Sequence, residues 1–440
     1  MADGAAGSLG RIPPVLSGAD VPDSLSHAGR RHFLFISAPF GPFAKELAHR
    51  LEAEGAACTR VILNAGDFLD WGWRPAKVYL GPRARWSDWL VGLIKQARIT
   101  DLISYGDSSP FSVDAVRLAA KLQLPVHVFE QGYFRPDWVT LEAGGVNANS
   151  KLPRDPAWYR GHPESHCTAE WVRIGKTTPT AIWHIVRYHA ALYAGLPVFF
   201  RYRLHYQHSA LSQAASHLTR AVVRALSRRR RRVLQQSLVS SGRPLYLALL
   251  QRPGDSQLWR HSDFERVEPF LDRVVESFAR CAPETAFLLI RPHPFDHGLD
   301  THERVLERLA HRYGVSGRTH LVDHGKLHEI LPAMSGAVCV NSTAGLAAVE
   351  FGCPTVVLGR AIYDMPGLTH QGGLDRFWRH AEPPDSVLYL AFRNVVMART
   401  QINGAYATKR GRKLATLGAA RRLMSPVSGK VREVPARFGE

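Results

Sequence analysis

Cysteine is scarce in this 440-residue sequence: there are five, and no two form a Cys-x-x-Cys pair. An odd number of thiols without paired spacing does not fit a disulfide framework. We therefore expect buried free thiols in a protein of a reducing compartment. The sequence also lacks His and Asp clusters with the spacing of a metal site, and it lacks P-loop and Gly-x-Gly-x-x-Gly patterns. These absences argue against NTPases and dinucleotide enzymes, so we expect no metal and no cofactor.

Long apolar runs are missing too. None reaches the ~18 residues that a membrane-spanning helix requires. Residues 1–30 lack the basic start and apolar centre of a secretory signal. We predict a disordered N-terminal tail at 1–30 and a C-terminal tail at 425–440. We expect a cytoplasmic protein that is either soluble or peripheral on the inner face of a membrane.

Acidic residues are few relative to basic ones. Asp and Glu number 38 against 56 Lys and Arg, which gives a net charge of +18. Such a surplus favours an anionic partner: nucleic acid, an acidic membrane face or a phosphorylated substrate. No helix-turn-helix, RRM or zinc-finger pattern occurs, so nucleic acid is not expected.

Short apolar strands alternate with amphipathic helices in the first part of the chain, residues 31–165. Continuous apolar strands between such helices predict a parallel sheet covered on both faces. The expected strands are 32–37, 60–64, 101–106 and 126–132, with helices near 44–56, 86–98 and 111–123.

A second series of the same kind fills residues 241–385, followed by C-terminal helices over 386–424. The expected strands are 245–251, 286–290, 319–322, 337–340 and 355–359, and the expected helices are 263–281, 301–313, 326–333 and 344–351. The fold class is therefore α/β, with two doubly wound Rossmann-like lobes. Ligands in such sheets bind beyond the carboxyl ends of the strands. Unusual loops gather at those ends, which predicts one cleft between the lobes. These loops are "SAPFGPF", "NAGDFLDW", "YGDSSP", "FEQGYFRPDW", "LQRPGDSQ", "IRPHPFD" and "VNSTAG".

Between the lobes, residues 166–240 are predicted to be mainly helical and basic. Arg220, Arg224, Arg228 and Arg231 recur every three to four residues, with apolar residues mostly on another face. This pattern indicates a basic amphipathic helix that suits an anionic membrane surface. A solvated helix packed on the core fits the same pattern.

Two loops of the second lobe suggest a phosphate site. His293 lies between two prolines at the exit of a strand, and Arg291 adds fixed charge beside it. Ser342 and Thr343 open a helix two strands further on, where free N–H groups and the helix dipole favour an anion. Structural explanations exist for each: a satisfied imidazole for His293, and an N-cap for Ser342 or Thr343. Together they predict a nucleotide-phosphate site.

Carboxylates in both lobes are candidates for catalysis. Asp255 follows a strand in a glycine-containing loop near Gln251, and Glu130 ends a strand of the first lobe. Asp107 in "YGDSSP" is a third candidate. Asp and Gly also form ordinary turns. One carboxylate from each lobe would supply the nucleophile and the acid/base that glycosyl chemistry uses.

The sequence resembles the capsule polysaccharide biosynthesis and export family of the KpsS/LipB type. The matching pieces run from about residue 32 to 406 and include "SAPFGPFAKELA", "NAGDFLDW", "FEQGYFRPDWVTLE", "RPHPFDHG", "VNSTAGLAAVEFGCPTVVLG" and "TQINGAY". The resemblance implies a GT-B-like retaining β-Kdo transferase that transfers Kdo from CMP-Kdo to a lysophosphatidylglycerol at the cytoplasmic face of the inner membrane.

The resemblance also assigns roles. Asp255 matches the proposed nucleophile, His293 the histidine on the CMP phosphate, and Ser342 and Thr343 the nucleotide-binding pair. Arg291 stands where the family pattern has lysine, and Glu130 matches an acid of the other lobe; Gln251 is grouped with the donor-binding residues. The alternatives are a non-catalytic factor that works with other capsule assembly or export proteins, and another nucleotide-sugar or polyol-phosphate transferase.

Overall fold

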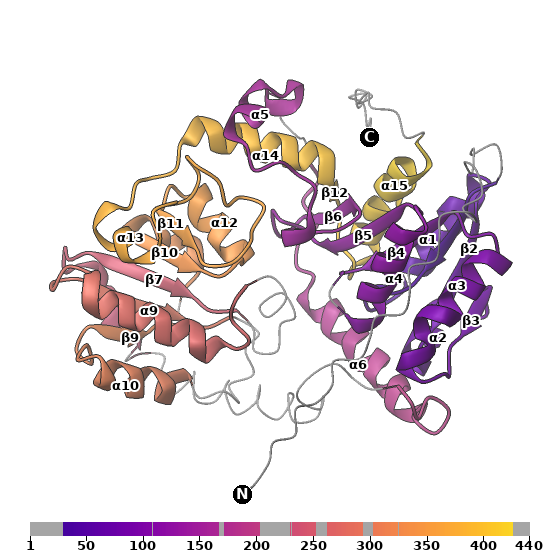
Figure 1. Cartoon of the computed structure of the whole chain (residues 1–440), viewed down its shortest axis with the longest axis horizontal. Coiled ribbons are helices and arrows are strands. Elements are labelled where there is room, and N and C mark those ends of the chain that lie inside the picture. Colours follow the sequence, from indigo (N-terminus) through magenta and orange to yellow (C-terminus); the bar gives the residue numbers. More distant parts are fainter. Residues whose placement is uncertain are drawn as a thin grey trace, which may run out of the picture.

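The computed structural model of the chain contains two α/β lobes side by side, joined by a long C-terminal helix (Figure 1). The structure describes residues 30–107, 109–166, 171–202, 229, 231–251, 262–293, 302–323 and 325–425. The two lobes of mostly parallel strands confirm the predicted α/β fold class.

The first lobe is built on a seven-stranded sheet with the order β12-β6-β5-β4-β1-β2-β3. The five neighbouring strands β5, β4, β1, β2 and β3 pair in parallel. Strand β6 pairs antiparallel with β5, and β12 pairs antiparallel with β6. The strands are β1 (His32–Phe35), β2 (Ala57–Ile62), β3 (Ala76–Val78), β4 (Asp101–Tyr105), β5 (Val126–Gln131), β6 (Trp138–Ala143) and β12 (Gln401–Asn403).

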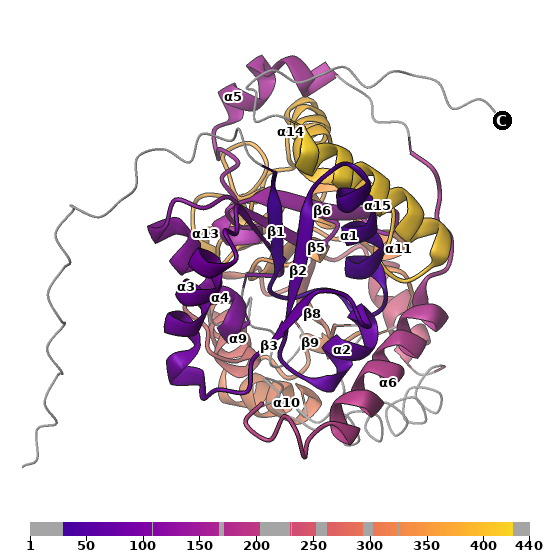
Figure 2. The ribbon, with the colours of Figure 1, turned by 90° about the vertical axis from the view of Figure 1, so that its right-hand side faces the viewer.

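Helices cover both faces of this sheet, because successive side chains of an apolar strand point to opposite faces. Phe33 and Phe35 of β1 pack under α1 and α15, whereas Leu34 and Ile36 pack under α3 and α4. Figure 2 shows these helix pairs on opposite sides of β1 and β2. The helices of this lobe are α1 (Phe43–Ala53), α2 (Ala65–Trp71), α3 (Trp86–Gln96), α4 (Pro110–Lys121) and α15 (Lys409–Met424).

The second lobe is an all-parallel sheet of five strands in the order β11-β10-β7-β8-β9. Its central strand, β7, is buried on both faces. The strands are β7 (Leu245–Leu249), β8 (Phe287–Arg291), β9 (Thr319–Leu321), β10 (Gly336–Cys339) and β11 (Thr355–Val357); the helices are α9 (Val267–Cys281), α10 (His302–Arg312), α11 (Leu327–Ile330), α12 (Thr343–Glu350) and α13 (Leu374–His380).

The C-terminal segment returns to the first lobe. Helix α14 (Ser386–Thr400) packs in a third apolar core that also holds Tyr133 and Trp138 of the first lobe and Leu346 of the second. The chain then adds β12 to the edge of the first sheet and lays α15 against α1. Residues from both ends of the sequence therefore build the first lobe.

Several elements differ from the sequence expectation. The stretch "NAGDFLDW", expected as a loop, forms α2, because Asn64 caps its N-terminus by accepting from the Gly66 and Asp67 N–H groups. The short strands β3, β6 and β12 were not expected. The expected helix 326–333 is one α-helical turn followed by a 3-10 turn at Leu331–Ala333.

The connecting region contains α5 (Pro156–Gly161) and α6 (Thr178–Ala194). Most of the expected basic amphipathic helix, with Arg220, Arg224 and Arg228, lies outside the described residues. Arg231 is described and forms ion pairs with Asp323 and Glu303 of the second lobe. Within the described ranges, no helix combines the length and apolar character needed to cross a membrane.

Candidate functional site

Three polar residues occupy equivalent positions at the carboxyl edge of the second sheet. Leu249 of β7 is in register with Cys339 on one side and with Arg291 on the other. The residue two positions after each of these three, just beyond the end of its strand, has a polar side chain. These residues are Gln251, His293 and Asn341. The parallel register thus brings predicted donor-binding residues of distant sequence segments to one edge.

Hydrogen bonds tie this edge together. The Gln251 side-chain amide donates to the Asn341 side-chain oxygen, which links the ends of β7 and β10. Gln251 itself is buried. The Arg291 guanidinium donates to the Gly325 carbonyl at 2.6 Å and so spans from β8 to the loop after β9. Arg291 therefore orders the loops of this edge.

Ser342 and Thr343 lie at the start of α12, as predicted. The Ser342 hydroxyl is the N-cap and accepts from the Ala344 N–H at 3.1 Å, and its carbonyl accepts from the Tyr363 hydroxyl at 2.6 Å. The Ser342 side chain therefore acts as an N-cap, which is the structural explanation given above for this residue. The helix start still directs its dipole towards the sheet edge that carries Gln251.

Asp255, the predicted nucleophile, lies outside the described residues. Its segment starts directly after Gln251, at the centre of the carboxyl edge. Asp255 itself is four residues further along the sequence.

A cavity of about 710 Å³ opens at the carboxyl edge of the first sheet. It is lined by the segments that follow β1, β2, β4 and β5, by one side of α6, and by residues 405–407. Glu130 at the end of β5 is part of this lining. The remaining wall is mixed: it contains aromatic and aliphatic side chains, such as Phe40, Trp138 and Leu192, and polar side chains, such as Asn64 and His189. Apolar surface combined with converging polar groups is typical of small-molecule binding.

Glu130 is positioned by its neighbours on the sheet edge. Its side-chain oxygen Oε1 accepts from the Gln131 N–H at 2.9 Å, and its carbonyl accepts from the Tyr406 hydroxyl at 2.8 Å. Gly106 lies beside this carboxylate: a Cβ there would be 3.4 Å from Oε2 of Glu130, which is an ordinary contact distance. Its φ of +67° is the feature that favours glycine at this position of "YGDSSP".

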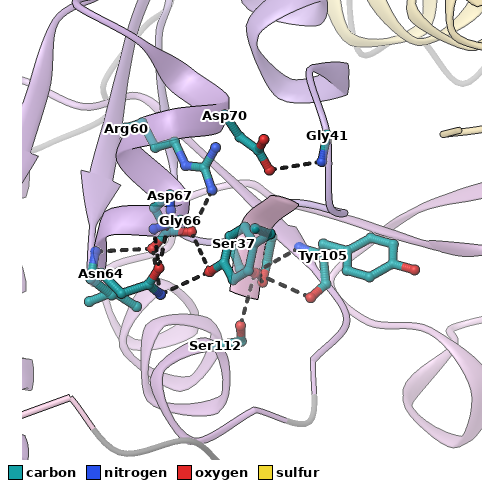
Figure 3. Close-up of polar contacts among 12 residues, drawn as sticks. Ser37, Gly41, Arg60, Asn64, Gly66, Asp67, Asp70, Tyr105 and Ser112 are labelled. Carbon is teal, nitrogen blue, oxygen red and sulfur yellow. Dashed lines mark hydrogen bonds and ion pairs between the residues drawn. The ribbon is translucent and has the colours of Figure 1, made fainter. Parts of the chain in front are cut away.

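A buried polar network fixes the wall between α2 and α6 (Figure 3). Arg60 pairs with Asp67 at 2.7 Å, and Asp67 accepts from the Tyr188 hydroxyl at 3.0 Å. Asn64 donates to the Tyr188 oxygen at 2.8 Å. Gly66 permits this approach, because a Cβ there would lie 2.7 Å from the Tyr188 ring. The network holds the Tyr188 ring against Phe40 at 4.7 Å between ring centres.

Asp107, the third predicted carboxylate, is buried and does not belong to the cavity lining. Its Oδ2 accepts from the Val146 N–H at 3.1 Å and from the Asn149 amide at 2.9 Å. These bonds order the turn after β6. The placement gives Asp107 a structural role there.

The cavity includes residues that the sequence analysis did not assign a role. Tyr406 comes from the C-terminal "NGAY", 276 positions after Glu130 in the chain. Tyr188 and His189 come from α6, and Asn64 from "NAGDFLDW". The motifs "NAGDFLDW" and "TQINGAY" were recognisable in the sequence, but no spacing rule connects them.

The structure brings the predicted residues together as two groups. Gln251, His293, Ser342 and Thr343 gather at the edge of the second sheet, and Glu130 lines the cavity of the first lobe. Among the described residues, the cavity lining comes from the first lobe, the α6 region and the C-terminal return. The single cleft joining both groups stays a prediction. The described part of the chain holds no cluster of three His, Cys, Asp or Glu that suits a metal ion.

The sequence model of the family described as capsule polysaccharide biosynthesis protein matches residues 100–406. The chain belongs to this family. It is 34% identical over 382 residues to the Escherichia coli capsule polysaccharide export protein KpsS, covering 86% of this chain and 97% of that protein. It is 32% identical over 386 residues to the Neisseria meningitidis serogroup A capsule polysaccharide modification protein LipB, covering 85% and 91%.

Among solved structures, the chain is similar to the β Kdo 2,7 transferase of Thermosulfurimonas dismutans KpsC. The sequence identity is 10%, the TM-score is 0.42, and the alignment covers 90% of this chain and 100% of that chain.

Proposed function

We propose that this capsule family member is a glycosyltransferase that transfers Kdo from CMP-Kdo to a lysophosphatidylglycerol acceptor and so starts a poly-Kdo linker. It would work at the cytoplasmic face of the inner membrane, with retention of the β configuration. The observation that carries the proposal is the pairing of a polar strand edge in one lobe with a carboxylate-bearing cavity in the other.

The donor would bind at the edge of the second sheet. A nucleotide phosphate carries negative charge, and His293 and the start of α12 supply hydrogen-bond donors and a favourable dipole there. Charge-assisted bonds of this kind stabilise a departing phosphate without a metal ion. Gln251 and Arg291 keep the loops of this edge in place.

The acceptor would bind in the cavity of the first lobe. The aromatic and aliphatic part of its wall suits an alkyl chain, its polar side chains suit a glycerol backbone, and its Glu130 carboxylate suits an acceptor hydroxyl. The family relatives named for polysaccharide export and modification support a capsule-related substrate.

In the proposed reaction, the Asp255 carboxylate attacks the anomeric carbon while the bond to the phosphate oxygen breaks, and CMP leaves with that electron pair. The acceptor hydroxyl then attacks the same carbon, its proton passes to Glu130, and Asp255 is released. Two inversions at one carbon retain the configuration. The two lobes would have to bring their edges together for both steps.

The test is direct. Purified protein is incubated with CMP-Kdo and lysophosphatidylglycerol, and the product mass is read by mass spectrometry, with CMP-sialic acid and a UDP-sugar as comparison donors. We expect the lipid to gain the mass of one or more Kdo units only with CMP-Kdo. If product forms only with another donor, the transferred sugar is that donor's sugar and not Kdo.

The printed name of KpsS favours a second candidate, a non-catalytic export factor. A scaffold has no need for the donor. If neither CMP nor CMP-Kdo binds the purified protein in calorimetry and no donor gives product, the export role would stand instead.

A further inference from the structure

Helix α6 exposes an apolar face to solvent. Ile182, Trp183 and Val186 follow one another at helical spacing and are 54%, 62% and 55% exposed. The only charged side chain of the helix, Arg187, is ion-paired with the buried Asp70. A surface helix normally shows polar residues on its solvent face. This helix does the opposite.

Further large apolar side chains are exposed on the two segments next to α6, which are residues 195–200 and α2. After α6, residues 195–200 expose Leu196, Val198 and Phe200, and α2, which packs against α6, exposes Leu69 and the adjoining Trp73. We call these residues and the three on α6 the α6 face. Figure 2 shows α6 at the rim of the molecule beside α2. Large apolar side chains exposed on neighbouring segments are typical of an interaction surface.

The charge of the surrounding sequence identifies the partner. Residues 171–240 contain no Asp or Glu, and they contain twelve Lys and Arg residues: Arg173, Lys176, Arg187, Arg201, Arg203, Arg220, Arg224, Arg228, Arg229, Arg230, Arg231 and Arg232. Of the described ones, Arg173, Lys176 and Arg201 are exposed just before and after the helix. Arg201 also stacks over the Phe200 ring at 5.0 Å.

An apolar helix face with tryptophan, flanked by cations and free of acids, matches the interface of an anionic lipid bilayer. There, apolar side chains insert at the headgroup boundary while arginines contact the phosphates. We propose that the protein docks on a bilayer of anionic phospholipid through the α6 face.

The cavity adjoins this face. Ala181, Ile185 and His189 of the same helix line the cavity, and Ile185 and His189 follow Ile182 by three and seven residues, so the cavity and the α6 face meet along the helix. Docking through α6 would hold the cavity beside the membrane, where a lipid acceptor can enter it. This inference deepens the proposed function, because the lipid nature of the acceptor rests on that proposal. The docking itself rests only on the α6 face.

The experiment is sedimentation of the full chain with vesicles of phosphatidylcholine alone or with added phosphatidylglycerol. The test variant carries Ile182→Gln, Trp183→Gln and Val186→Gln, none of which lines the cavity. The matched control carries Val387→Gln and Leu390→Gln on α14, where the two side chains are 68% and 54% exposed. Far-UV circular dichroism checks that both variants fold.

We expect the wild type and the control to bind the phosphatidylglycerol vesicles, and to bind phosphatidylcholine vesicles far more weakly. The α6 variant should bind at least about tenfold more weakly, since each inserted large apolar side chain contributes on the order of tenfold to partitioning. Transfer to a short-chain acceptor in solution should be unchanged in the α6 variant, so loss of docking and failure of the proposed transferase are distinguishable.

Equal vesicle binding by the α6 variant and the wild type would overturn the proposal. So would a wild type that ignores both vesicles while forming dimers that the α6 variant cannot form, because the face would then bind a second copy. Wild-type binding that does not depend on phosphatidylglycerol would refute the anionic character of the partner.

Discussion

Glu142 on β6 gives the protein a pH-dependent stability. Burial raises the pKa of this carboxyl from its ordinary 4.5 to about 7, although the Ser150 and Tyr133 hydroxyls both donate to it. The folded state therefore binds a proton more tightly than the unfolded state does. Between these two pKa values the free energy of unfolding falls as the pH rises. The stabilisation is fully present below about pH 4.5 and is lost as the pH passes 7.

The size of the effect follows from the shift. A change from 4.5 to about 7 corresponds to about 3 kcal/mol when the whole range is crossed. Between about pH 5 and pH 8 the accessible part is roughly 2–3 kcal/mol. Glu142→Gln keeps the shape of the side chain and removes the titration. The variant should therefore lose this part of the pH dependence. The unfolding free energy of the variant minus that of the wild type should be larger at about pH 8 than at about pH 5.

The assay is urea unfolding of both proteins at several pH values, followed by far-UV circular dichroism. Other titrating groups contribute equally to both, so the difference between the two unfolding free energies isolates Glu142. A difference that stays constant from about pH 5 to pH 8 would refute the reasoning. Tyr133→Phe, which removes one donor to the carboxylate, should move the titration of Glu142 to higher pH.

Three further variants separate structural from chemical roles. Asp255→Asn should abolish transfer while CMP binding in calorimetry is retained; substantial turnover without deamidation would remove Asp255 as the nucleophile. Asp107→Ala should lower the free energy of unfolding by about 2 kcal/mol or more, because both bonds that Oδ2 accepts from Val146 and Asn149 are lost, and transfer per folded molecule should persist. Tyr188→Phe should cost roughly 1–3 kcal/mol in urea unfolding through its lost bond to Asp67, and no cost would mean that the network is not coupled.

The central strands of both sheets, β1 and β7, were predictable because their residues are apolar almost without interruption. Phe33 to Ile36 are buried on both faces, and this pattern occurs in parallel sheets covered by helices. The carboxyl-edge position of His293 followed from the same pattern, since Pro292 cannot continue the ladder.

Other parts depend on contacts between distant segments. Strand β12 has three residues, and Gln401 in it is buried because its side chain accepts from the Tyr133 N–H and donates to Thr140. Nothing local distinguishes such a strand from a loop. The same holds for Tyr406, whose hydroxyl reaches the Glu130 carbonyl only after the chain has returned from the second lobe.

The candidate site was predicted unevenly for a physical reason. Sequence patterns place residues at strand ends, and they therefore located Glu130, Gln251 and His293. They do not tell whether a carboxylate at such an end faces a cavity or a neighbouring turn. Asp107 and Glu130 lie at the ends of adjacent strands, and only the folded structure shows that Asp107 accepts bonds from Val146 and Asn149 whereas Glu130 lines the cavity.

The proposed mechanism divides the two substrates between the lobes: the second lobe binds the donor and the first lobe binds the acceptor. Steady-state kinetics with both substrates varied test it, using His293→Ala and the cavity-filling Ala181→Phe, with Ala190→Phe on the exposed side of α6 as the matched control. We predict that His293→Ala raises the KM for CMP-Kdo by about tenfold or more, that Ala181→Phe raises only the KM for the lipid acceptor, and that the control changes neither. An Ala181→Phe enzyme with an unchanged acceptor KM, or a His293→Ala enzyme with unchanged donor kinetics, would contradict the division of the two substrates between the lobes.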